Sequence, residues 1–238
     1  MNIFEGTLRT EFIETVARDT KKFRFSVLST SPLIPTEEEF GYASGQFLSL
    51  KFSDTAWRAY SIASHPDEEF IEFVIRYVPN GTASDVFWKT KIGDTFEFKG
   101  PFGELELSET KEAHLVFCAT GTGIAPFRSM ILEEKKKESP RKMTLLYGGR
   151  NAEDISYLDE IANWSENLKV ILGLSREEKN NIDLPWEPCR ITEFLEKGNW
   201  EQNTEFYICG SGSMVKSVNE LLESKGIKKE KIFMERFN

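Results

Sequence analysis

Arg58, Tyr60 and Ser61 lie close together in the stretch RAYSIAS (58–64), directly after the apolar run GQFLSLKF (45–52). A strand here turns Arg58 and Tyr60 to one face and Ser61 to the other, because side chains alternate along a strand. A guanidinium beside a flat ring can hold a ligand that is both anionic and aromatic. The alternative is an exposed strand with an ordinary Arg–Tyr pair, since short motifs also match by chance.

Two glycine-rich stretches could bind phosphate, ATGTGIAP (119–126) and CGSGSMV (209–215). Each follows an expected strand and opens an expected helix, whose first N–H groups are free to bind an anion. The first stretch is GxGxxP rather than GxGxxG and so departs from the usual dinucleotide fingerprint. Both could also be plain strand-to-helix turns. Cys209 is either a buried strand residue or part of a site at the end of its strand.

The elements that would position these residues change character near residue 110. Before it, short aromatic and β-branched runs separated by turn residues indicate a small antiparallel barrel with one short helix at 83–91. After it, strands alternate with helices, which predicts a parallel sheet covered on both faces. We therefore expect an antiparallel β-barrel domain over residues 1–108 and an α/β domain with a five-stranded parallel sheet over residues 109–238. The second domain should have strands at 114–120, 143–149, 168–175, 205–210 and 231–237, and helices at 126–138, 157–164, 190–197 and 213–226.

Composition excludes several classes of function. The formal net charge is −9 and the pI is about 5.0, which argues against general affinity for nucleic acid or anionic membranes. No apolar run approaches the roughly 18 residues of a membrane helix, and the N-terminus has acids where a signal peptide is apolar. Cys118, Cys189 and Cys209 are too widely spaced for a disulfide framework or a metal-cluster ligand set. We expect a monomeric cytoplasmic protein without a metal site.

Several blocks of the chain, taken together, resemble the ferredoxin–NADP reductase family of flavoproteins. RAYSIAS (58–64) and GTAS (81–84) are similar to the two flavin-binding motifs of the family. GDTFEFKGPFG (93–103) resembles the strand and loop that end its barrel. The nicotinamide half is matched by GTGIAPF (121–127), YGGR (147–150), CGSGSMV (209–215) and the terminal ERF (235–237). The resemblance extends over nearly the whole chain, with the blocks in the family's order.

The resemblance implies bound FAD and a role for each motif residue. Arg58 would pair with the flavin pyrophosphate, Tyr60 would lie against the flavin ring, and Ser61 would stand near its reactive nitrogen. The catalytic residues would be Ser61, Cys209 and Glu235, which would stand beside the nicotinamide. Phe237 would either cover the flavin or pack in the last strand. The remaining cofactor-binding residues implied are Gly81, Thr82 and Ser84 for the flavin pyrophosphate and Gly121, Thr122, Gly123, Pro126, Gly210 and Met214 for the nicotinamide coenzyme.

The resemblance also bears on the choice of coenzyme. Ser175 and Arg176 resemble the pair that receives the 2′-phosphate in members that use NADP, and Arg150 adds a second cation. Glu177 and Glu178 follow at once, so NAD stays possible. NADP is the coenzyme that we predict.

By the same resemblance, the chain would be an oxidoreductase that passes electrons between NADPH and a separate ferredoxin or flavodoxin through FAD. Arg9, Arg18, Lys21 and Lys22 are candidates for a basic face that meets an acidic carrier. The alternatives are an NADH-dependent reductase component of an oxygenase, a free flavin or quinone reductase, and a non-catalytic flavin-containing regulatory subunit.

Overall fold

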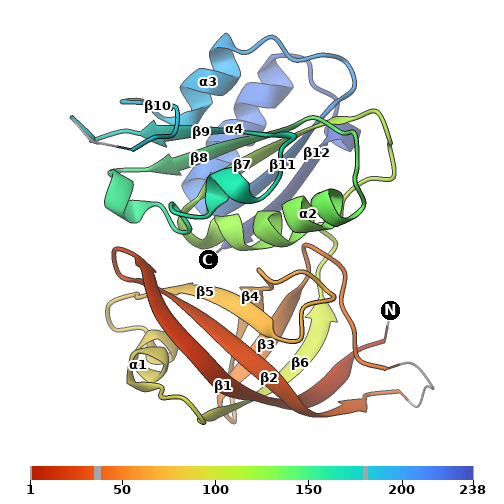
Figure 1. The fold of residues 1–238 in the computed structure, drawn as a ribbon, viewed down its shortest axis with the longest axis vertical. Helices are drawn as coiled ribbons and strands as arrows, with labels where there is room; N and C mark the ends of the chain where they lie inside the picture. The colour runs from red at the N-terminus through yellow and green to blue at the C-terminus, as the bar shows by residue number, and fades with distance from the viewer. Residues whose placement is uncertain (1, 35–38, 179–181, 238) are drawn as a thin grey trace.

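The computed structural model describes residues 2–34, 39–178 and 182–237 of the chain. The chain folds into two domains that lie against each other, the N-terminal one in red to yellow and the C-terminal one in green to blue (Figure 1). Each domain is built on its own six-stranded sheet. Helix α2 (Ile124–Lys136) of the second domain lies along the boundary between them.

The first domain is an antiparallel sheet with strand order β4-β3-β6-β1-β2-β5 that curls into a barrel. Its two edges approach each other where the Ala63 N–H donates to the Glu72 carbonyl over 2.8 Å. The barrel core is rich in phenylalanine, with Phe23, Phe25 and Phe73 fully buried, and this apolar surface stabilises the fold. Its elements are β1 (Phe4–Ala17), β2 (Thr20–Pro32), β3 (Phe47–Ser53), β4 (Ala56–Ser61), β5 (Ile71–Arg76), α1 (Thr82–Lys89) and β6 (Thr95–Phe102).

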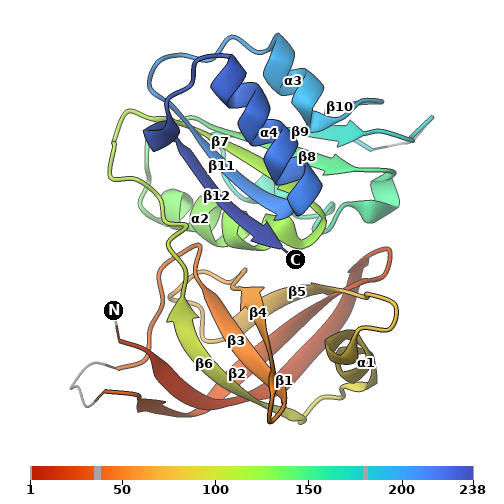
Figure 2. The same ribbon diagram turned by 180° about the vertical axis from the view of Figure 1, so that it is seen from behind.

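The second domain is a parallel sheet with strand order β10-β9-β8-β7-β11-β12. Helix α2 covers the face toward the barrel, and α3 and α4 cover the opposite face (Figures 1 and 2). Short 3₁₀ turns, η1 (Gly121–Gly123) and η2 (Ala152–Asp154) among them, connect some of these elements. The main elements besides α2 are β7 (His114–Thr120), β8 (Met143–Gly149), β9 (Leu168–Leu174), β10 (Trp186–Glu187), α3 (Ile191–Lys197), β11 (Thr204–Ser211), α4 (Gly212–Ser224) and β12 (Ile232–Phe237).

The connection between the domains, residues 103–113, is fixed to the second domain at Ser108. The Ser108 N–H donates to the Tyr207 hydroxyl over 2.9 Å, and the Ser108 hydroxyl donates to Glu205. The Ser108 carbonyl accepts a hydrogen bond of 2.8 Å from Arg141. The boundary that we propose between residues 108 and 109 falls in this connection.

The two-domain fold class is confirmed, and three elements differ from the sequence-based expectation. The long strand β1 was not predicted, because much of its second half is exposed and carries polar residues. The helix predicted at 157–164 is wrong. Tyr157 has a φ of +62°, which no helix accommodates, and only a 3₁₀ turn at Ile161–Asn163 remains. The sheet gains a sixth strand, β10, which has two residues and is too short for its pattern to show.

Candidate cofactor-binding site

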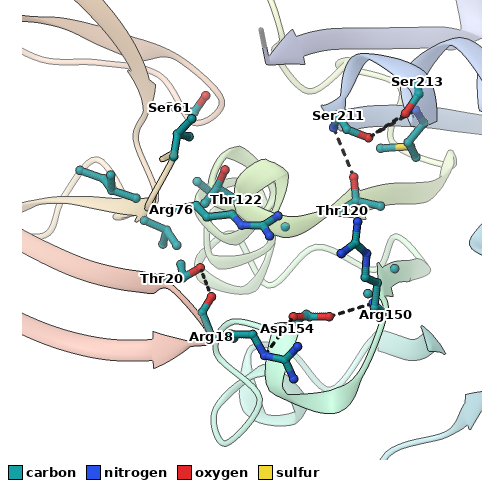
Figure 3. Close-up of a pocket in the computed structure, with 18 of the residues that line it drawn as sticks. Arg18, Thr20, Ser61, Arg76, Thr120, Thr122, Arg150, Asp154, Ser211 and Ser213 are labelled. Atoms are coloured by element: carbon teal, nitrogen blue, oxygen red, sulfur yellow. Dashed lines mark hydrogen bonds and ion pairs between the residues drawn. The ribbon is translucent and has the colours of Figure 1, made fainter. Parts of the chain in front are cut away.

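A cavity of about 960 Å³ lies between the two domains, at the edge where the parallel strands end. On the barrel side it is lined by β4, the end of β5 and the start of α1. On the other side it is lined by η1, by residues where β8 and β9 end, and by the start of α4 (Figure 3). Open α/β sheets bind their ligands at this edge. The volume is at the upper end of the range for small-molecule sites and suits a large or composite ligand.

Strand β4 brings Arg58, Tyr60 and Ser61 to the cavity. Arg58 is exposed, and its guanidinium donates to the Trp57 carbonyl over 2.8 Å. The Tyr60 ring packs edge-on against buried Phe87, and burial raises the pKa of its phenol, so the ring stays neutral. All three residues line the cavity, and Ser61 is the last residue of β4, an edge strand of the barrel sheet.

The start of helix α1 offers donors to the same cavity. Gly81 is the N-cap residue and makes no side-chain cap, so the first N–H groups of the helix have no partner within it. Gly81, Thr82 and Ser84 all line the cavity. The Ser84 hydroxyl accepts a hydrogen bond of 2.9 Å from the Val78 N–H and keeps its own proton to donate. This arrangement suits an anion such as a pyrophosphate.

The first glycine turn approaches the cavity from the C-terminal domain. Gly121 has a φ of +55°, and nothing lies within 4 Å of where a Cβ would be, so its backbone is open to a ligand. Thr122 lines the cavity beside it. A Cβ on Gly123 would collide with the Cys209 carbonyl, so this glycine lets the start of α2 pack closely against β11. Pro126 is buried in the first turn of α2 and is not among the described cavity-lining residues.

The second glycine turn is joined to the first by hydrogen bonding. The Ser211 N–H donates to the Thr120 hydroxyl over 3.3 Å, and the Ser211 hydroxyl caps α4 by accepting from the Met214 N–H. Met214 and Ser211 line the cavity. Gly210 has a φ of +145° and packs against Thr120 without lining the cavity. Phe237 pairs with Ser211 in the sheet, and its side chain lies outside the described part of the chain.

The three residues expected at the reaction centre lie near one another, in different environments. The Ser61 hydroxyl donates to the Glu235 carboxylate over 3.0 Å, across the domain boundary. Burial raises the pKa of Glu235, and the hydrogen bond from Ser61 lowers it only in part. Cys209 pairs with Glu235 in the sheet and is completely buried, so burial and then Glu235 raise the pKa of its thiol. Of the three, only Ser61 is among the cavity-lining residues.

Arginines gather around the cavity. Arg76 and Arg150 extend toward it from the first and second domains respectively (Figure 3), and Arg58 and Arg190 also line it. Among the described residues, none of these four forms an ion pair with a carboxylate, in a chain of net charge −9. Ser175 lines the cavity, whereas Arg176 does not.

Two arginines of the cavity, Arg76 and Arg190, were not predicted from the sequence. Arg76 follows the apolar run 73–75, five positions before Gly81, so a cation at a strand end beside a glycine motif was the available signal. Arg190 precedes α3 and reaches the cavity only because α3 packs beside β8 and β9. No local pattern marks it.

The site fits FAD and a nicotinamide dinucleotide. Unpaired guanidinium groups and helix N-terminal N–H groups match pyrophosphates, and Tyr60 offers an aromatic surface. Among the described residues, no group of three or more His, Cys, Asp or Glu side chains could hold a metal ion. Within the same part of the chain, no helix is long and apolar enough to cross a membrane. Fold and site together define a dinucleotide-binding oxidoreductase with two domains.

Comparison with known proteins specifies the family. Residues 7–107 match the oxidoreductase FAD-binding domain, and residues 117–220 match the oxidoreductase NAD-binding domain. A solved structure of a ferredoxin NADP⁺ reductase from Neisseria gonorrhoeae, with bound FAD and NADP, superposes with a TM-score of 0.81. It is 25% identical, and the match covers 98% of each chain. The chain belongs to the ferredoxin–NADP reductase family, whose cofactors are FAD and a nicotinamide dinucleotide.

Two curated relatives are longer than this chain. The F component of the Na⁺-translocating NADH-quinone reductase of Marinomonas sp. (strain MWYL1) is 32% identical over 79% of this chain and 50% of the relative. The electron transfer component XylA of the xylene/toluene monooxygenase of Pseudomonas putida is 28% identical over 94% of this chain and 66% of the relative. The chain thus spans about half to two thirds of the length of these relatives.

Proposed function

We propose that this chain is a reductase that transfers electrons from NADPH through FAD to a separate one-electron carrier of the ferredoxin or flavodoxin type. One observation carries the proposal. A single cavity is walled by the RAYS strand of the first domain and by the first glycine turn of the second, with unpaired arginines on both sides. This arrangement supports the binding of two dinucleotides whose reactive rings meet at the domain boundary.

The chemistry itself belongs to the cofactors, since a nicotinamide supplies a hydride and a flavin can accept it and release single electrons. The chain binds and orients the two groups. Arg58 and the start of α1 would hold the flavin pyrophosphate, and Tyr60 would lie along its ring. Glu235 Oε1 can hold a proton because burial raises the pKa of this carboxyl, and Ser61 Oγ connects it to the cavity. Cys209 would support the nicotinamide side from its buried position.

NADP is the coenzyme that the cations favour. Arg150, Ser175 and Arg190 all line the part of the cavity that lies beyond β8 and β9. Guanidinium groups are the side chains best suited to bind a phosphate, and a 2′-phosphate is what distinguishes NADPH from NADH. Arg176 lies outside the lining, so we assign the main role to Arg150 and Arg190.

The separate carrier is supported by the Neisseria gonorrhoeae ferredoxin NADP⁺ reductase, which this chain matches over almost its entire length. Of the four N-terminal cations considered for a basic face, Lys21 lies over the Trp88 ring and the other three form ion pairs. Arg9 pairs with Glu11 at 2.7 Å, Arg18 with Glu153 at 2.5 Å and Lys22 with Glu14 at 2.8 Å.

A second candidate is a NADH-dependent reductase component that serves an oxygenase or a quinone reductase. The curated relatives favour it, because XylA is named an electron transfer component and the Marinomonas protein is named as part of a NADH-quinone reductase. The cytoplasmic location and the monomeric state stay predictions.

The test is an anaerobic titration of the purified yellow protein. The flavin released by heat should be FAD, and its absorbance should bleach with one equivalent of NADPH and more slowly with NADH. Catalytic reduction of a ferredoxin or flavodoxin should follow. Faster bleaching by NADH would favour the second candidate. A protein that binds FAD and is bleached by neither coenzyme would overturn both in favour of a non-catalytic regulatory role.

A further inference from the structure

A cluster of charged and hydrogen-bonded side chains, three of the four buried, lies at the domain boundary, outside the described cavity lining. Its centre is Glu72 on β5, whose side chain is completely buried. One carboxylate oxygen of Glu72 accepts from Arg24 Nε over 2.7 Å, and the other accepts from the Tyr157 hydroxyl over 2.6 Å. Arg128 Nη1 lies 3.6 Å from that second oxygen. We call Arg24, Glu72, Arg128 and Tyr157 the interdomain cluster.

The cluster draws its members from both domains. Arg24 and Glu72 belong to the barrel, whereas Arg128 lies on α2 and Tyr157 follows η2. A buried carboxylate is costly unless it is paired and hydrogen-bonded, so Glu72 is fully satisfied only in this docked arrangement. Burial opposes the charge of Arg128, but Glu72 and other carboxylates outweigh it and raise the pKa of Arg128. Arg128 therefore stays charged at any ordinary pH.

Two members of the cluster, Arg128 and Glu72, are connected to residues close to the cofactor site. Arg128 Nη1 donates to the Ala63 carbonyl over 2.9 Å, two residues beyond Ser61. Arg128 also lies on the helix that begins at the first glycine turn. On the other arm, Glu72 lies four residues before Arg76 on the same strand. One rigid set of contacts thus connects the flavin-side wall to the nicotinamide-side wall.

The backbone of Tyr157 takes an uncommon conformation, which places the side chain for its contact with Glu72. Its φ of +62° lies in the left-handed region, which a bulky residue seldom adopts. The ring packs edge-on against Trp164 and turns the hydroxyl toward Glu72. Burial, followed by the charge of Glu72, raises the pKa of Tyr157 well above its usual value, so the phenol keeps the proton that it donates.

We propose that Arg128 and Tyr157 are positioning residues for hydride transfer, which fix the distance between the two cofactor rings by docking both domains on Glu72. The inference rests on the proposed function. Hydride transfer needs the reacting atoms about 3–3.5 Å apart, and a misplacement of about 1 Å can reduce the rate about a hundredfold. The cluster touches neither cofactor site directly, so its effect is on geometry rather than on binding.

Tyr157→Phe is the main test, because it removes one hydroxyl and keeps the ring. Thr144→Val is the control, since it removes a buried side-chain hydroxyl that bonds only to His114 within the second domain. Anaerobic stopped-flow absorbance gives the hydride-transfer rate, the coenzyme Kd and the long-wavelength charge-transfer band of the stacked rings. We expect Tyr157→Phe to slow transfer about tenfold and weaken the band, with Kd changed less than about twofold. Thr144→Val should keep the wild-type rate.

A series at Arg128 and a measurement without cofactor complete the test. Arg128→Lys keeps the charge and should retain more of the rate than Arg128→Met. In the cofactor-free protein, amide hydrogen exchange at β5 and at the start of α2 should accelerate in Tyr157→Phe and not in Thr144→Val.

Two outcomes separate the inference from the proposed function. A wild type that is reduced, with Tyr157→Phe equal to Thr144→Val in rate, band and exchange, would overturn the positioning role alone. A wild type that neither coenzyme reduces would overturn the proposed function and the positioning role with it.

Discussion

The hydrogen bond between Ser61 and Glu235 joins side chains 174 positions apart, one from each domain. Ser61 ends an edge strand of the barrel, and Glu235 lies on the last strand of the parallel sheet. Ser61 is buried and Glu235 is partly buried, and this burial raises the pKa of the carboxyl. The pair thus forms only when the two domains are docked.

The raised pKa of Glu235 predicts a stability that depends on pH. The folded protein binds this proton more tightly than the unfolded chain, so folding stability falls as pH rises from the ordinary carboxyl pKa through the raised one. Glu235→Gln removes this loss, so the variant should gain stability relative to wild type above that window and lose the gain below it. Urea unfolding over a pH series measures the difference.

Glu230→Gln serves as its control, because Glu230 is an exposed glutamate in the same region. Its folding stability relative to wild type should stay the same across this pH window. A Glu235→Gln variant whose stability runs parallel to wild type at every pH would contradict the burial argument.

Arg190 and Arg176 allow a direct test of the coenzyme site. Arg190 lines the cavity and Arg176 does not. A charge-assisted contact to phosphate contributes roughly 1.5–3 kcal/mol, so Arg190→Ala should raise the KM for NADPH about ten- to a hundredfold. The KM for NADH should hardly change, and Arg176→Ala should cause a smaller effect. Steady-state kinetics with both coenzymes decides this, and equal losses with NADPH and NADH would remove Arg190 from the phosphate site.

At the scale of elements, close packing between the start of α2 and β11 sets the shape of the nucleotide side. The Gly123→Ala substitution would force a Cβ into the Cys209 carbonyl, which is backbone and cannot rotate away. We expect a loss of about 1–3 kcal/mol in the free energy of unfolding, measured by denaturant titration without cofactor.

Gly212→Ala is the matched control for this substitution. Gly212 begins α4 with nothing within 4 Å of its Cβ position, so alanine there should be neutral or stabilise by about 0.4–1 kcal/mol. If the two alanine variants were equally stable, the close approach of α2 to β11 would not be a constraint on the fold.

Much of the element order could be predicted, for a physical reason. Strands buried on both faces are continuous apolar runs, and β7 and β8 begin and end at the predicted residues. Strand β1 was not predicted, because its exposed half lies at an edge of the sheet and carries polar residues. The segment at 157–164 has helical composition, yet Tyr157 takes a left-handed backbone to reach Glu72 in the other domain. Contacts over such distances leave no local pattern.

The residues of the candidate site likewise divide into those that a local sequence pattern predicts and those that it does not. The motif residues Arg58, Gly81 and Gly121 were predicted from their neighbours along the chain, and they line one cavity. Arg76 and Arg190 are brought there by strand pairing and helix packing, which the sequence pattern does not encode locally.

At the scale of the whole molecule, the cavity concentrates positive charge in an acidic protein. Among the described cavity-lining residues, Arg58, Arg76, Arg150 and Arg190 lack ionic partners, whereas the chain as a whole carries −9. The positive charge of such a cavity suits polyphosphate ligands. Binding of a dinucleotide should therefore stabilise the fold as a whole.

FAD should raise the unfolding temperature because it binds the folded state alone. At about a hundred times its Kd, the ligand adds about 2.7 kcal/mol to the free energy of unfolding. Riboflavin lacks the pyrophosphate that Arg58 and α1 would hold, so at equal concentration it should stabilise much less. Scanning calorimetry of the cofactor-free protein with each ligand measures both shifts, and equal shifts would remove the pyrophosphate from the site.

The anchored connection at Ser108 has a consequence for recombination between members of the family. A chimaera that joins residues 1–108 to a foreign nucleotide domain keeps Ser108 but exchanges Tyr207, Glu205 and Arg141, which hold it. The connection in the chimaera then lacks these hydrogen bonds, so the relative position of the two domains is no longer fixed. An exchange of domains between reductases with different acceptors therefore requires that the three anchoring side chains are transferred together with residues 1–108.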